Sequence, residues 1–201
     1  MYLFGASGHA KVIIDILKSQ GGTVKGFFDD DVTRLELGGV PVIGITEDHS
    51  AVHNPCLIAI GNNRIRKNVV GRLPQAVYQK AIHTSAIVAE SVHVGEGTAV
   101  MAGTVINPDT SIGEHCIINT SASVDHDCEV GDFVHIAPNV TLCGGIKVGE
   151  GTFIGAGAPV IPNISIGKWV TIGAGAVVIA DVPDYAVVVG NPGQIIKYNT
   201  P

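Results

Sequence analysis

Sixteen consecutive hexads fill residues 86–181 without an insertion or deletion: AIVAES, VHVGEG, TAVMAG, TVINPD, TSIGEH, CIINTS, ASVDHD, CEVGDF, VHIAPN, VTLCGG, IKVGEG, TFIGAG, APVIPN, ISIGKW, VTIGAG and AVVIAD. The third residue of every hexad is Val, Ile or Leu, from Val88 to Val178. A period this strict indicates a repeat architecture, in which each unit buries its apolar face against its neighbours.

The residue types within a hexad predict the shape of the repeat. The branched third residue and the small or apolar first residue lie on the same face of a short strand. Positions four to six are rich in Gly, Asn, Asp and Pro, which favour turns. Because the same face is buried in every unit, the strands have to wind as a coil and cannot pair as hairpins. We therefore expect a parallel β-helix with a continuous interior ladder of Val and Ile.

Residues 1–80 follow a different pattern. Short apolar runs predict strands at 2–4, 24–28, 41–45 and 56–60, and apolar residues at helical spacing predict helices near 12–17 and 64–73. This alternation is typical of a small, Rossmann-like parallel α/β domain. We expect that domain over residues 1–80, followed over residues 81–201 by the β-helix domain and a C-terminal tail.

A glycine-rich turn, Gly5-Ala6-Ser7-Gly8-His9, joins the first expected strand to the first expected helix. Free backbone N–H groups and the helix dipole make such a turn a place for phosphate, although a plain chain reversal would look the same. Asp29, Asp30 and Asp31 follow the second strand, where carboxylates suit ribose or sugar hydroxyls. The third glycine of a dinucleotide fingerprint is missing and the domain is small, so a nucleotide sugar fits better than a dinucleotide.

Charge and composition exclude several partners. The net charge is −6, and the only basic run is the short Arg64, Arg66, Lys67, which argues against nucleic acid or an anionic membrane surface. The first residues lack the features of a signal peptide, and no apolar run is long enough to span a bilayer. We expect a cytoplasmic protein without membrane insertion.

The four cysteines, Cys56, Cys116, Cys128 and Cys143, show no spacing typical of zinc ligands. Cys116 and Cys128 fall on the first position of their hexads, which points into the coil. Free cysteine is often simply buried, so we interpret them as reduced structural residues and expect no metal site.

A small α/β domain that opens with Gly-Ala-Ser-Gly-His, joined to hexads that contain Val124-Asp125-His126-Asp127-Cys128, resembles the hexapeptide-repeat sugar O- and N-acetyltransferases of bacterial glycan synthesis. Segments 27–30, 59–63 and 189–192 extend the resemblance over nearly the whole chain. It is greatest to the group of UDP-4-amino-4,6-dideoxy-sugar N-acetyltransferases of the UDP-N-acetylbacillosamine pathway. The resemblance implies a left-handed coil with three hexads per turn, acetyl-CoA as co-substrate, and a homotrimer with active sites between subunits.

The resemblance also implies roles for individual residues. His126 would be the general base, Asp127 would raise its basicity, and Asn119 would lie near the reacting groups. His135 would contact acetyl-CoA near its thioester, and Ala156 and Ala174 would line the pantetheine groove through their backbone. The nucleotide amino sugar would be held by Ser7, Gly8, His9, Asp29, Asp30 and Gly61.

The chemistry of the hexad turn fits this reading. Acetyl transfer to an amine needs proximity, a proton acceptor and a donor for the developing oxyanion. Asp125-His126-Asp127 supplies an imidazole as proton acceptor and a carboxylate to orient it, and no other histidine of the repeat lies between two acids. His126 and His135 are nine residues apart, half of an eighteen-residue coil. They are expected on opposite sides of the coil, so a neighbouring subunit must supply one of them if they act together.

Four other readings stay open. The Asp-His-Asp turn could be polar filler on a solvated edge. The acceptor could be a hydroxyl of sialic acid or a related sugar. His115, His126 and His135 could bind zinc at a subunit interface, as in the hexapeptide-repeat carbonic anhydrases. Finally, the chain could be a sugar-nucleotide sensor without catalytic activity.

Overall fold

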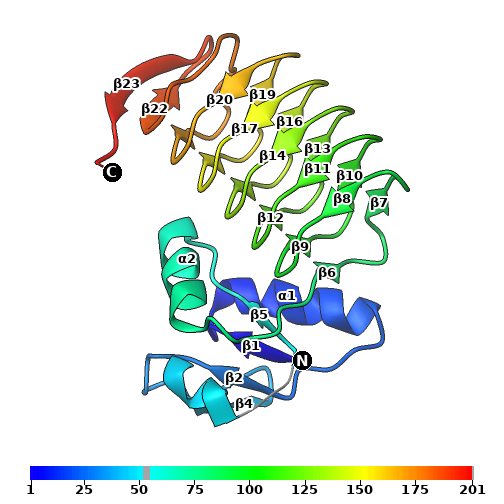
Figure 1. Cartoon of the computed structure of the whole chain (residues 1–201), viewed down its shortest axis with the longest axis vertical. Coiled ribbons are helices and arrows are strands. Elements are labelled where there is room, and N and C mark those ends of the chain that lie inside the picture. Colours follow the sequence, from blue (N-terminus) through cyan, green and yellow to red (C-terminus); the bar gives the residue numbers. More distant parts are fainter. Residues whose placement is uncertain (52–54, 201) are drawn as a thin grey trace.

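The computed structural model describes residues 1–51 and 55–200. Figure 1 shows an α/β part that lies alongside a three-sided coil. Its contacts extend along the coil, from Arg66 at the His115 carbonyl to Arg64 at the Trp169 ring and the Thr200 carbonyl. No helix in the described ranges is both long and apolar enough to cross a membrane.

The α/β part is built on one sheet with the strand order β3-β4-β2-β1-β5. Its parallel strands are β1 (Tyr2–Phe4), β2 (Gly26–Phe28), β4 (Val40–Gly44) and β5 (Cys56–Ile58), and β3 (Glu36–Leu37) pairs with β4 antiparallel. The helical elements are α1 (Gly8–Ser19), α2 (Asn63–Arg72) and the short 3-10 helix η1 (Thr46–Ala51). The predicted strands and the second predicted helix are confirmed to within two residues at their ends, whereas α1 begins four residues before the helix predicted near 12–17, and β3 and η1 were not predicted.

Helix α1 packs against the sheet through Ala10, Ile13, Ile16 and Leu17, which are all buried. Val12, which the helical spacing groups with them, is 37% exposed. Val12 lies at the edge of the apolar stripe of α1, next to the side of the helix that faces solvent.

The coil has three parallel faces, which we number in the order in which the chain visits them after residue 86. The first face contains β7 (Ile87–Val88), β10 (Val105–Ile106), β13 (Ser123–Val124), β16 (Thr141–Leu142) and β19 (Pro159–Val160). The second contains β8 (His93–Val94), β11 (Ser111–Ile112), β14 (Glu129–Val130), β17 (Lys147–Val148) and β20 (Ser165–Ile166). The third contains β6 (Ala81–Ile82), β9 (Ala99–Val100), β12 (Ile117–Ile118), β15 (His135–Ile136), β18 (Phe153–Ile154), β21 (Thr171–Ile172), β22 (Ala186–Val189) and β23 (Gln194–Tyr198).

The register confirms three hexads per turn. Ile106 pairs with Val124, and Ile112 with Val130, so each residue lies against the one eighteen positions later. The third residues of the hexads are buried from Val94 to Val178, and only Val88, in the first hexad, is partly exposed. The predicted interior ladder is therefore confirmed. The antiparallel hairpin of β22 and β23, which ends the coil, was not predicted.

The threonines and cysteines that are buried at the first position of the hexads have hydrogen-bond partners for their polar groups. Thr110 Oγ1 donates to the Asp125 carbonyl at 2.7 Å and accepts from the Cys128 N–H at 3.1 Å, so its hydroxyl is satisfied twice. Cys116 and Cys128 are buried, and all four cysteines are free, as the sequence predicts. A polar hydroxyl in this core thus stabilises the turns, because it bonds backbone groups that would otherwise lack partners.

The sixth position of the hexad has a positive φ in every turn from Gly97 to Gly175. Bulky residues rarely adopt this conformation, yet His115, Phe133 and Trp169 do so, at the corner between the second and third faces. Their rings face α2 and its flanking loop. Tyr78 meets the His115 ring edge-on at 4.4 Å, and the Arg64 guanidinium lies 4.9 Å above the Trp169 ring.

Arg66 holds the α/β part to the coil. Its side chain is 1% exposed, and its nitrogens donate to five oxygens: the carbonyls of Ile60, Gly61, His115 and Phe133, and Oδ1 of Asn63. The other two residues of the basic run also contact their own chain, since Lys67 pairs with Glu150 and Arg64 donates to the Thr200 carbonyl. The basic run therefore serves the docking of α2 on the coil.

Candidate active site

The turn between β1 and α1 presents an open helix N-terminus. The Ser7 side chain makes no capping hydrogen bond, and no acidic residue lies in the first turn of α1. Gly8 is exposed, and a Cβ built on it would meet nothing within 4 Å. The positive end of α1 is therefore accessible to an anion, as the phosphate-turn prediction requires.

Two predicted carboxylates lie beside this turn. Asp29 Oδ2 accepts from the Ala6 N–H at 2.6 Å and pairs with Arg34 at 3.2 Å. Asp30 accepts from Arg72 at 2.7 Å and from the Thr46 N–H at 2.9 Å. The Arg72 hydrogen bond is the main cause that lowers the pKa of Asp30 to about 2, so this carboxylate is ionised at neutral pH.

A cavity of about 460 Å³ connects these groups. Ser7, Asp29 and Asp30 line it together with Arg34 and Arg72, two cations that sequence reasoning missed. No local motif marks either arginine, because each reaches the cavity from a segment whose position depends on the folded sheet. The cavity thus combines carboxylates for hydroxyl groups with guanidinium groups and a helix N-terminus for phosphate.

A second cluster joins the α/β part to the third face of the coil. Asn119 Nδ2 lies 3.1 Å from His135 Nε2, and His135 Nδ1 lies 3.2 Å from the Gly61 carbonyl. The His9 ring is close by, with its centroid 6.4 Å from that of His135. An amide NH₂ only donates and a carbonyl only accepts, so we assign the His135 proton to Nδ1.

Both histidines of this cluster are held neutral. Burial, followed by the positive charge of Arg66, lowers the pKa of His135 to about 4 and that of His9 to about 4. His9 Nε2 is buried without a hydrogen-bond partner among the described residues. The structure thus brings together four of the predicted residues, His9, Gly61, Asn119 and His135.

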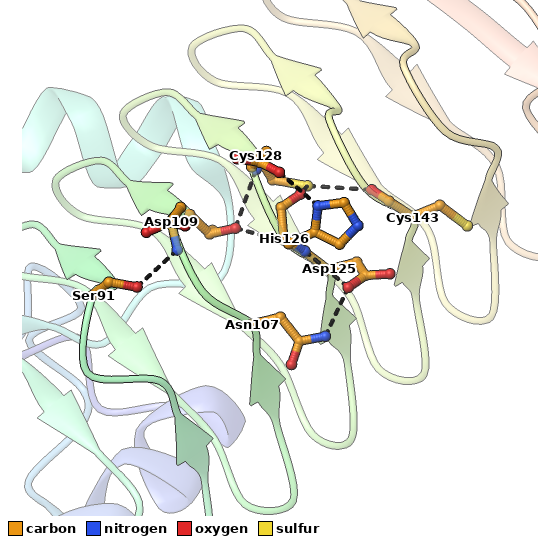
Figure 2. A network of polar contacts seen from close by, with 9 residues as sticks. Ser91, Asn107, Asp109, Asp125, His126, Cys128 and Cys143 are labelled. Carbon is orange, nitrogen blue, oxygen red and sulfur yellow. Dashed lines mark hydrogen bonds and ion pairs between the residues drawn. The ribbon is translucent and has the colours of Figure 1, made fainter.

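The third group lies in the turn between β13 and β14, which Figure 2 shows in close-up. His126 Nδ1 is 2.6 Å from Asp127 Oδ2, and both side chains are more than half exposed. The hydrogen bond to Asp127, followed by the charge of Asp125, raises the pKa of His126. Because a carboxylate oxygen accepts, we assign the proton to Nδ1, which leaves the Nε2 lone pair free. Nε2 has no protein partner within the described ranges.

Two further contacts hold this turn in place. Asn107 Nδ2 donates to Asp125 Oδ1 at 2.8 Å, and the same oxygen accepts from the His126 N–H at 2.9 Å (Figure 2). Asn107 lies eighteen residues before Asp125, which is one turn of the coil. Sequence reasoning missed Asn107, although its eighteen-residue spacing from Asp125 is the signal that would have identified it.

Ala156 and Ala174 lie at a different corner, between the third and first faces. Both are exposed, and they stack one coil apart, with the Gly175 N–H donating to the Ala156 carbonyl at 2.9 Å. Within the described residues, the N–H groups of both alanines lack hydrogen-bond partners. They are therefore free to donate to an amide-containing chain such as pantetheine.

Within one protomer, His126 and the His135 cluster lie too far apart to form a single site. His126 lies in the turn between the first and second faces, whereas His135 lies on β15 of the third face, on the opposite side of the coil. This is the separation that the nine-residue spacing predicts. His115 is buried, stacked on Phe133 at 5.2 Å between ring centroids, so it cannot reach a neighbouring subunit as a zinc ligand.

Alanine substitutions at Gly5 and Gly8, the two glycines after β1, are expected to change different properties of the protein. Gly5 has a φ of 92°, and a Cβ on it would approach Ile60 Cγ1 to 2.7 Å. We expect Gly5→Ala to lower the free energy of unfolding by roughly 1–3 kcal/mol. Gly8→Ala should leave it unchanged but raise the KM for a phosphate-bearing substrate several-fold. Thermal denaturation and kinetics check both; a destabilised Gly8→Ala protein would contradict this reading.

Comparisons with known proteins follow the same division of the chain. Residues 1–73 match the PglD N-terminal domain, and residues 109–144 and 145–180 match the bacterial transferase hexapeptide repeats. The perosamine N-acetyltransferase of Caulobacter crescentus, solved with CoA and GDP-perosamine, is 42% identical with a TM-score of 0.92, and the match covers 98% of this chain and 96% of that one. The chain belongs to the hexapeptide-repeat sugar acetyltransferase family.

Two other sugar acetyltransferases are also similar to this chain. The acetyltransferase domain of PglB from Neisseria gonorrhoeae, solved with acetyl coenzyme A, is 36% identical over 97% of this chain and 98% of that chain, with a TM-score of 0.91. The UDP-N-acetylbacillosamine N-acetyltransferase of Bacillus subtilis is 41% identical over 50% of this chain, and the match spans 50% of that protein. A protein of Acanthamoeba polyphaga mimivirus is 35% identical over 55% of this chain, and the match covers only 23% of that protein.

Membership of the hexapeptide-repeat sugar acetyltransferase family confirms several predictions. The repeats indicate the left-handed coil that periodicity alone did not give. At the level of the family, the prediction of an acetyltransferase with acetyl-CoA as co-substrate is also confirmed, because the relatives are acetyltransferases solved with CoA or acetyl-CoA.

Proposed function

We propose that this protein is an acetyl-CoA-dependent N-acetyltransferase that acts on the 4-amino group of a nucleotide-linked amino-deoxy sugar. The observation that carries the proposal is the His126–Asp127 pair, because it leaves Nε2 without a protein partner among the described residues, on a side chain that is 60% exposed in a turn of the coil. Its neighbours in structure are sugar N-acetyltransferases, which supports an amine as acceptor.

In the proposed reaction, His126 acts as the general base. The neutral amine attacks the thioester carbonyl, and its proton passes to His126 Nε2 as the C–N bond forms. Asp127 stabilises the resulting imidazolium through Nδ1, and the C–S bond then breaks to release CoA as its thiolate, which takes the proton from Nε2 and leaves as the thiol. Asn119 and the neutral His135 would lie near the thioester, and the free N–H groups of Ala156 and Ala174 would bind the pantetheine arm.

The nucleotide end of the substrate would occupy the cavity beside α1. Its diphosphate would face the helix N-terminus at Ser7, Gly8 and His9, and Asp29 and Asp30 would accept bonds from hydroxyl groups. Gly61 and His9 would then place the sugar toward Asn119 and His135. A UDP-linked sugar is our first candidate, and the GDP-perosamine bound by the Caulobacter relative makes a GDP-linked sugar the direct competitor.

We further propose that the site is shared in a homotrimer. The nucleotide cavity and the His135 cluster lie on the third-face side of one protomer, while His126 faces away from them. A neighbouring coil would bring its His126 to the amine held by the first protomer. A cyclic trimer satisfies this need with one interface repeated three times.

The direct test is to incubate the protein with acetyl-CoA and either UDP- or GDP-linked 4-amino sugars, and to measure thiol release and product mass. We expect one of the two to give sustained release with an acetylated product. If neither is acetylated but either binds, the non-catalytic sensor is favoured. Faster acetylation of sialic acid than of any nucleotide amino sugar would favour the O-acetyltransferase reading. The cytoplasmic location stays a prediction.

The raised pKa of His126 predicts a pH effect. The base must be deprotonated, so kcat should rise with pH through the pKa of His126 and then level off. Asp127→Asn removes the main cause of the raised pKa, so the rising limb should move to lower pH while the plateau falls. Rates measured between pH 5 and 9, in roughly the range where histidine titrates, check this; an unmoved limb would contradict the role of Asp127.

A further inference from the structure

Gly144 is the only glycine at the fifth position of the sixteen hexads. The other fifteen fifth positions are occupied by Glu, Ala, Pro, Thr, His, Asp and Lys. The backbone at this position therefore accepts residues with a Cβ. Gly144 itself does not have a positive φ, so its backbone conformation does not explain the glycine.

Glycines at the two neighbouring positions of the hexad have other causes. At the fourth position, a Cβ on Gly113 would approach the backbone of the next coil, to 2.7 Å from the Asp132 nitrogen. At the sixth position, Gly145 has a φ of 71°, which favours glycine by itself. Neither cause applies to Gly144.

What a side chain on Gly144 would meet is the imidazole of His126. A Cβ built on Gly144 would lie 2.7 Å from both Cε1 and Nε2 of that ring. Gly144 is one coil above His126, and its neighbour Gly145 donates its N–H to the His126 carbonyl at 2.9 Å. The ring thus lies in the space that the missing Cβ leaves open.

We infer that Gly144 is a positioning residue for His126: it makes the space in which the imidazole can keep its hydrogen bond to Asp127 while Nε2 faces the substrate. Two contacts then fix the ring from two sides, with Asp127 at Nδ1 and the bare backbone of Gly144 beside the Cε1–Nε2 edge. An added methyl would push the end of the side chain away, because the ring can rotate and the coil backbone cannot.

The first test does not depend on activity. In a double-mutant cycle, Gly144→Ala and His126→Ala are compared singly and together by thermal denaturation, and the Gly144→Ala crystal structure is solved. We expect a displaced ring in Gly144→Ala, and any loss of stability should disappear once His126 is alanine. An unmoved ring, or an equal loss in both backgrounds, would overturn the inference, since the glycine would then serve the backbone.

The second test rests on the proposed function of His126. Gly144→Ala should lower kcat roughly 10- to 100-fold with little change in the KM for either substrate, because a base displaced by about 1 Å no longer reaches the amine well. Gly71→Ala is the matched control, since a Cβ there meets nothing within 4 Å, and it should keep the wild-type kcat. If His126→Ala keeps full activity, the proposed function is wrong, while the cycle still decides the role of Gly144. An unchanged kcat in Gly144→Ala alongside an inactive His126→Ala would overturn the inference.

Discussion

Replacing His126 with alanine should lower kcat for acetyl transfer about 10²- to 10⁴-fold, the usual contribution of a general base. The imidazole is exposed and, among the residues that the structure describes, its ring bonds only the neighbouring Asp127, so its loss removes the proton acceptor without disturbing the coil. Dissociation constants for nucleotide sugar and CoA, measured by calorimetry, should stay within about threefold. A thiol-release assay gives the rate.

His93→Ala is the matched control for this change. His93 is an exposed histidine on β8 of the same coil, and it lies outside each of the groups described above. It should retain the wild-type rate. If His126→Ala also retains it, the Asp-His-Asp turn is polar filler and another group takes the proton.

Arg66→Ala should cause the largest loss of stability. Arg66 binds carbonyls from both parts of the molecule, and removing it leaves four main-chain acceptors, two of them buried and two partly buried, without this donor. Each lost partner costs about 1–3 kcal/mol, and since the losses are not additive we expect about 3–5 kcal/mol in total. Chemical denaturation would measure it.

Arg66→Lys separates charge from geometry. A lysine keeps the positive charge but cannot donate to five oxygens at once, so we expect an intermediate loss of stability. The loss should appear as weaker docking of the α/β part, seen as faster amide exchange in α2 than in the strands of the coil. An Arg66→Ala protein as stable as the wild type would show that α2 is held by its other contacts.

The fold could be predicted from the sequence because its signal is local and repeated. The buried residue of each hexad can be recognised within the hexad itself, so residues 86–181 are enough to predict the coil. The hairpin of β22 and β23 was missed because residues 186–198 abandon the hexad period. The fit of α2 on the coil was missed for another reason: it depends on His115, Phe133 and Trp169, which share a corner only after the coil has formed.

The candidate site could be predicted only where its partners are adjacent in sequence. His126 and Asp127 lie in one turn, so their pairing was readable. The contacts of Arg66 between the two parts could not be predicted, because its five oxygens come from three segments that are far apart in the sequence, residues 60–63, His115 and Phe133. Asn107 and Gly144 are intermediate, because their partners are neither adjacent in sequence nor unrelated to the repeat. Each lies eighteen residues from its partner, a spacing that carries meaning once the period of the coil is known.

The central claim is that acetyl transfer occurs at a site shared between chains, and mixing two inactive variants tests it most directly. His126→Ala lacks the base, and Gly8→Glu places a negative charge where the diphosphate would bind. Unfolded together and refolded as mixed trimers, they should recover about one quarter of the wild-type rate, because one site in four combines two intact halves. If the mixture stays as inactive as its components while each variant still folds, the site is not shared and the account is wrong.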